Sequence, residues 1–194
     1  MGFFDTLFGR QKPAPMGPEK LFAISTAQVA LEAEQSLKPT NTAAICFKGM
    51  ASGPFTQMLT EMEQLLKLAS SDDQLTVKPY NDEFDYRWFI FSGADFQALV
   101  TALHIASQTL VDKGYSTTLL FAVFPFTSAQ GHEMYWMYNY KRGTFYPFVP
   151  QTDSHDRARA RNNPEELRLA TAMKRELPVE PELERWFPAW GLPF

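Results

Sequence analysis

Residues 134–150, MYWMYNYKRGTFYPFVP, decide the fold because they predict a β-hairpin built almost entirely from large side chains. Aromatic residues and methionines dominate 134–140, and such residues suit a pleated, half-buried strand. A turn follows at Lys141, Arg142 and Gly143, where glycine supplies the positive φ that a tight turn requires. The extended pattern then resumes over 144–149. The stretch therefore predicts two antiparallel strands joined by a short basic turn.

Side chains alternate between the two faces of a strand, and this hairpin carries large apolar groups on both. The first strand divides into two sets: Tyr135, Met137 and Asn139 on one face, and Met134, Trp136, Tyr138 and Tyr140 on the other. Apolar surface on both faces must be kept from water. We therefore expect the hairpin to lie in a sheet that is covered on both sides.

The composition indicates one globular domain. The chain has 194 residues, of which 45% are hydrophobic and 21% charged. Its net charge of -4 gives no electrostatic reason to expect nucleic-acid binding. A single cysteine, Cys46, excludes an internal disulfide and fits a reducing compartment. No apolar run approaches the roughly 18 residues of a membrane span, and no signal peptide is evident, so we expect a cytoplasmic protein.

Hydrophobic periodicity predicts the other elements of the domain. Helical spacing marks 18–37, 55–69, 94–113 and 164–176, and strand-like runs mark 43–48, 75–80, 86–91 and 117–126. This order predicts an α+β fold with a mainly antiparallel sheet and helices packed against it. The central β-α-β-β-α-β portion allows a ferredoxin-like arrangement. A helix-flanked hairpin sheet, as in secretion-chaperone-like folds, is the alternative.

The chain divides into three parts by composition. Residues 1–18 predict an apolar helix and a Pro/Gly linker, 19–176 a single α+β domain, and 177–194 an aromatic C-terminal tail. The tail carries Trp186, Phe187, Trp190 and Phe194 between prolines. Leaving so much apolar surface in water costs about 25 cal/mol per Å². We therefore expect the tail to pack on the domain.

The N-terminal helix presents one apolar face. Phe3, Phe4, Leu7 and Phe8 lie at helical spacing. Three roles are open for this face: folding back onto the domain, lying in a membrane interface, or docking into a groove of a partner. These four side chains are the candidate residues for membrane or partner docking.

The sequence contains no recognisable catalytic or metal-binding constellation. His104, His132 and His155 are not paired with another histidine or cysteine at metal-ligand spacing. A P-loop, a dinucleotide-binding glycine pattern and a nucleophile elbow are also missing from the sequence. We therefore predict no catalytic residues, no metal and no cofactor.

The hairpin tip is the place where we expect a binding site, if the folded domain has one. The candidate residues gather around the turn: Tyr138, Tyr140, Lys141, Arg142, Gly143 and Tyr146. A cationic pair among aromatic rings suits a carboxylate, a phosphate or an acidic partner. The alternative is an exposed turn whose charges only keep it soluble.

Four segments resemble one protein family. They are MGFFDTLFGR at 1–10, FAVFPF at 121–126, YKRGTFYPFVP at 140–150 and LPVEPELERWFPAWG at 177–191. Together they resemble the PspA-associated protein PspAB, which belongs to bacterial and archaeal phage-shock-type envelope-stress systems. The resemblance implies a small cytoplasmic protein working near PspA, a coiled-coil protein that remodels and protects membranes. It supplies no catalytic residues.

Two functional hypotheses follow. The first is a non-enzymatic adaptor or regulator of envelope stress, which contacts PspA or another envelope-stress protein and touches the membrane through residues 1–10. The second is an enzyme or a small anionic-ligand binder with a pocket at the 134–150 hairpin. A flat aromatic patch favours the first, and a deep apolar pocket with convergent polar groups favours the second.

Overall fold

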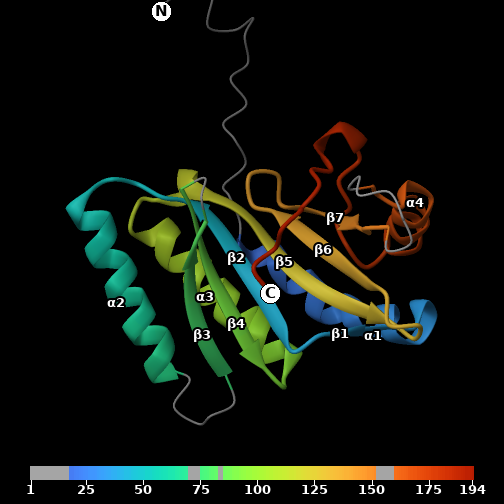
Figure 1. Ribbon diagram of the computed structural model, residues 1–194, viewed down its shortest axis with the longest axis horizontal. Helices are drawn as coiled ribbons and strands as arrows, with labels where there is room; N and C mark the ends of the chain where they lie inside the picture. The colour runs from blue at the N-terminus through green and yellow to red at the C-terminus, as the bar shows by residue number, and fades with distance from the viewer. Residues whose placement is uncertain (1–17, 70–74, 83–84, 152–159) are drawn as a thin grey trace, which may run out of the picture.

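The computed structural model describes residues 18–69, 75–82, 85–151 and 160–194, and there it has four α-helices and a seven-stranded antiparallel sheet (Figure 1). The helices are α1 (Ala23–Gln35), α2 (Gly53–Ala69), α3 (Phe96–Asp112) and α4 (Asn163–Ala172). The strands are β1 (Leu37–Pro39), β2 (Thr42–Lys48), β3 (Leu75–Asn81), β4 (Tyr86–Gly93), β5 (Leu119–Ser128), β6 (Glu133–Asn139) and β7 (Thr144–Phe148). The predicted α+β class is confirmed.

The strand order is β3-β4-β2-β5-β6-β7, and β1 also pairs with β5. Every one of these strand pairs is antiparallel. The segment β2-α2-β3-β4-α3-β5 therefore places its strands in the order of a ferredoxin-like unit, which is one of the two arrangements that the sequence allowed. The β6-β7 hairpin extends this unit on the β5 side.

The predicted hairpin is formed by β6 and β7. Tyr135 pairs with Phe148 at its open end, and Asn139 pairs with Thr144 next to the turn. Gly143 has a φ of 64°, which lies in the left-handed region that favours glycine. Asn139 closes the turn, because its side-chain oxygen accepts from the Lys141 amide at 3.0 Å. Its carbonyl accepts from the Gly143 amide at 2.8 Å.

The helices cover one face of the sheet. Trp136, Tyr138 and Tyr140 are buried there in the main hydrophobic core, together with side chains of α1, α2 and α3. Asp95 caps the start of α3 by accepting from the Gln97 amide at 2.9 Å. The helix layer therefore buries all four residues that the sequence places on this face of the first hairpin strand, Met134, Trp136, Tyr138 and Tyr140.

The C-terminal segment crosses the opposite face of the sheet (Figure 1). A second cluster on this face brings together Met137, Tyr146, Phe148 and Trp186. The rings of Tyr146 and Trp186 stack with centroids 6.3 Å apart. The hairpin thus has helices on one face and chain from the C-terminus on the other, as its two apolar faces predict.

One predicted helix differs from the observed structure. The stretch 18–37 begins as a 3-10 helix, η1 (Pro18–Phe22), and α1 ends at Gln35. Ser36 then adopts a left-handed backbone with φ of 55°, and Leu37 already belongs to β1. Phe3, Phe4, Leu7 and Phe8 lie outside the described residues.

Candidate binding site

The structure separates the two basic residues of the hairpin tip. Arg142 binds the Glu180 carboxylate through two hydrogen bonds, from Nε at 2.8 Å and from Nη2 at 3.0 Å. It also donates to Glu182 at 2.9 Å. Lys141 is exposed and lines a pocket on the face crossed by the C-terminal segment. Arg142 therefore joins the hairpin to the C-terminal segment, whereas Lys141 lies at the wall of that pocket.

Glu180 is only 1% exposed, and its carboxylate accepts hydrogen bonds from the side chains of Arg142 and Thr144. Burial acts to raise the pKa of its carboxyl group, but hydrogen bonds from Arg142 and Thr144 outweigh burial and hold the pKa below its ordinary value. The neighbouring backbone is also fixed, because the Phe145 amide donates to Pro178 and the Glu180 amide donates to Phe145, both at 2.8 Å. This network attaches the start of the C-terminal segment to the free edge of β7.

A pH prediction follows from Glu180. A carboxyl group whose pKa is lowered by folding stabilises the protein above its unfolded-state pKa of about 4.3, and this stabilisation is lost as pH falls through the folded-state pKa. We expect wild type to be more stable than Glu180→Gln at pH 7, with the difference shrinking below about pH 4.3. Urea unfolding of both proteins between pH 7 and pH 3 measures this. A difference that stays constant over this range contradicts the assignment.

The candidate residues of the hairpin do not all face the same way. Tyr138 and Tyr140 point into the helix-side core, where burial raises the pKa of both phenol groups. Gly143 packs at the turn, where an added Cβ would lie 3.2 Å from Lys20 Cδ. Lys141 and Tyr146 do line the same pocket.

That pocket, which we call the aromatic groove, has a volume of about 870 Å³. It lies between β3, β4, the hairpin turn and the C-terminal segment. Seven aromatic residues line it: Tyr80, Tyr86, Trp88, Phe121, Tyr146, Phe187 and Trp190. Trp88 donates from its indole nitrogen to Asp82 at 3.1 Å, which fixes the ring at the groove. Asp82 and Lys141 place one charge of each sign at its wall.

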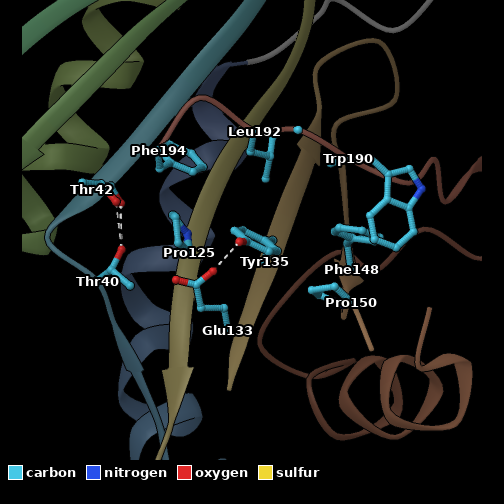
Figure 2. A pocket seen from close by; sticks show the side chains of 12 residues that line it. Thr40, Thr42, Pro125, Glu133, Tyr135, Phe148, Pro150, Trp190, Leu192 and Phe194 are labelled. Atoms are coloured by element: carbon cyan, nitrogen blue, oxygen red, sulfur yellow. Dashed lines mark hydrogen bonds between the residues drawn. The ribbon is translucent and has the colours of Figure 1, made fainter. Parts of the chain in front are cut away.

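A second pocket, which we call the Glu133 pocket, lies on the other side of the C-terminal segment and has a volume of about 420 Å³ (Figure 2). Residues 189–192 line both pockets and therefore separate them. The hydroxyl of Tyr135 donates to the Glu133 carboxylate at 2.7 Å. Figure 2 shows Trp190 beside Phe148, with Phe194 on the other side of Tyr135.

The described histidine, cysteine and acidic side chains were compared with the usual arrangements of metal and nucleophile sites. Across 18–69, 75–82, 85–151 and 160–194, no group of three or more His, Cys, Asp or Glu side chains is placed to hold a metal ion. Burial, and then the charge of Asp82, raise the pKa of the Cys46 thiol, so this buried residue is protonated at neutral pH. His104 contacts the Pro18 carbonyl at 3.3 Å and packs on Phe22. In the same part of the chain, no helix combines the length and apolar character of a membrane span.

The sequence suggested a pocket at the 134–150 hairpin, and both pockets include residues of this hairpin, but the contribution of the C-terminal segment to their walls was not predicted. Both depend on where the C-terminal segment crosses the sheet, and tertiary packing decides that course. A usable signal was present in the sequence, because the prolines and aromatic residues of 186–194 suit an extended segment lying on an apolar surface.

Comparison with known protein families gives a match over the whole chain. The family model of PspA associated protein B matches residues 1–194, the entire chain. No curated protein and no solved structure matches. The chain therefore belongs to the PspA-associated protein B family.

Proposed function

We propose that this chain is a non-enzymatic adaptor of a PspA-type envelope-stress response, which binds PspA through the aromatic groove. The observation that carries the proposal is the gathering of exposed aromatic side chains at one groove. Tyr80 is 42% exposed, Tyr86 39% and Phe187 59%. Aromatic residues that remain accessible beside a well-packed sheet are typical of protein interfaces.

The groove suits a helical partner. Its aromatic wall can bury the apolar side chains of an amphipathic helix, and Asp82 and Lys141 can pair with charges beside that stripe. A coiled-coil protein such as PspA offers apolar and charged side chains in this pattern. Family membership supports PspA as the partner.

The N-terminal residues form the second part of the proposal. Phe3, Phe4, Leu7 and Phe8, whose spacing predicts an apolar helical face, are proposed to contact the membrane or the partner. Such contact would hold the domain where PspA works.

Photo-crosslinking in cells tests the groove. We expect p-benzoylphenylalanine at position 187 to crosslink to PspA under envelope stress. Val29 is the control position, because it is 71% exposed on α1, away from the groove. Crosslinks to PspA from both positions, or from neither, would contradict the proposal.

A small anionic-ligand binder is the second candidate. It is supported by the ammonium group of Lys141 and the aromatic ring of Tyr146, which line the same pocket. Lys141→Ser tests this second function, because the variant should lose anion binding, whereas the crosslink from position 187 depends mainly on the aromatic wall of the groove.

A further inference from the structure

We infer that the Glu133 pocket binds an alkylated ammonium cation, such as a trimethylammonium group. Four aromatic side chains and one carboxylate line it: Tyr135, Phe148, Trp190, Phe194 and Glu133. Its volume of about 420 Å³ lies in the range of small-molecule sites. This site lies apart from the groove proposed above for PspA and stands on its own observations.

The aromatic rings form a continuous surface around Tyr135 (Figure 2). The Tyr135 centroid lies 5.9 Å from that of Phe148 and 6.5 Å from that of Phe194, with interplanar angles of 28° and 12°. Trp190 meets Phe148 edge to face at 4.8 Å. The faces of aromatic rings carry partial negative charge, so they attract a cation that sits over them.

The formal charge on the described side chains that line the pocket is negative. Glu133 is the only charged residue among the described side chains that line it, and no lining residue is basic. The hydroxyl of Tyr135 donates to one of the two carboxylate oxygens of Glu133, which holds this carboxylate at the pocket. Burial and the neighbouring Glu133 raise the pKa of Tyr135, so the phenol is neutral at physiological pH. Among the described side chains, the wall of the pocket therefore carries a negative charge.

The protein already uses one of these rings to hold a cation. The guanidinium carbon of Arg161 lies 5.4 Å from the centroid of Phe148. Arg161 does not line the Glu133 pocket, and it is paired with Glu166 at 2.9 Å. The ring system thus accepts positive charge at one place, while the described residues that line the pocket include no cation.

The aromatic surface of the pocket favours an alkylated cation over a primary ammonium. The hydroxyls of Thr40 and Thr42 hydrogen-bond each other at 3.0 Å, and one Glu133 oxygen accepts from Tyr135, so each of these polar groups is already partly engaged. A primary ammonium brings three N–H donors that lose water on entering, and ring faces accept hydrogen bonds only weakly. A methylated ammonium has no such requirement, and its methyl groups gain from contact with the rings.

The probe that tests the inference is choline, with 3,3-dimethyl-1-butanol as its neutral isostere. Isothermal titration of the full-length chain should show saturable choline binding, with at least tenfold weaker binding of the isostere, since only choline gains the cation–π and carboxylate attraction. Comparable binding of both compounds would show a merely apolar pocket and overturn the inference.

Two variants locate the site. Glu133→Gln should weaken choline binding by about tenfold without changing the thermal midpoint, because Glu133 is exposed. Phe194→Ala removes one ring and should also weaken binding. Glu32→Gln on α1 is the matched control and should bind choline as wild type does. Unchanged binding by Glu133→Gln would overturn the site.

The same headgroup chemistry occurs in a free solute and in a lipid. Flotation with phosphatidylcholine vesicles, compared with phosphatidylglycerol vesicles, distinguishes these sources. Glu133-dependent binding to the first vesicles assigns a lipid headgroup, and binding of choline alone assigns a free solute. Either result supports the inference, and failure of both choline and vesicles to bind overturns it.

Discussion

Replacing Arg161 with leucine is expected to lower the free energy of unfolding by about 3–5 kcal/mol. Arg161 is the ion-pair partner of Glu166, which is only 2% exposed. In the variant, the buried Glu166 carboxylate still accepts a hydrogen bond from the Val149 amide at 2.8 Å. It loses, however, the positive charge of Arg161 that compensates its own negative charge. Arg161 also donates to the Trp186 carbonyl, so the variant loosens the C-terminal segment as well. Urea unfolding at pH 7 measures the difference.

The matched control for this variant is Arg168→Leu. Arg168 pairs with Glu165 at 2.7 Å on the surface of α4, where both side chains are partly exposed. Exposed ion pairs contribute about 0–1 kcal/mol, so this variant should stay close to wild type. If the two variants lose the same small amount of stability, the Arg161–Glu166 pair does not hold the C-terminal segment to the sheet.

Replacing Trp186 with alanine is expected to cost about 3–5 kcal/mol, which is typical of a large buried aromatic residue. The ring is buried on the face opposite the helices, stacks on Tyr146, and donates from its indole nitrogen to the Glu180 carbonyl at 3.1 Å. Its removal leaves a cavity beneath the C-terminal segment and an acceptor without its donor. Thermal and urea unfolding both report the loss.

Phe187→Ala provides the comparison for Trp186. Phe187 is the next residue in the chain, but it is largely exposed in the aromatic groove. Substitution of an exposed side chain should change stability by about 0.5 kcal/mol or less. Equal and small effects at both positions would mean that the C-terminal segment does not pack on the sheet in solution.

The sequence was sufficient for the fold class because its strongest pattern is local. Alternation along 134–140 identified the two faces of β6, and the structure buries Trp136 among helices and Met137 beneath the C-terminal segment. The three residues of β1 were not predicted, because a strand so short carries no periodicity. It exists through pairing with the far end of β5, and sequence order does not reveal that pairing.

The candidate site was less predictable because it depends on long-range partners. Lys141 and Arg142 are adjacent and chemically similar, so a sequence treats them as one basic pair. Only the folded chain places Glu180 opposite Arg142 and leaves Lys141 at the aromatic groove. The pockets likewise require residues 189–192, which lie far along the chain from the strands that they cover.

The most direct test of the proposed function is the affinity of the purified chain for purified PspA of the same system. We expect wild type to bind, and the double variant Tyr86→Ser with Phe187→Ser to bind at least tenfold more weakly, because it loses two exposed aromatic contacts of the groove. Val29→Ser on α1 is the control and should bind as wild type does. Equal affinity of the double variant and wild type for PspA would contradict the account.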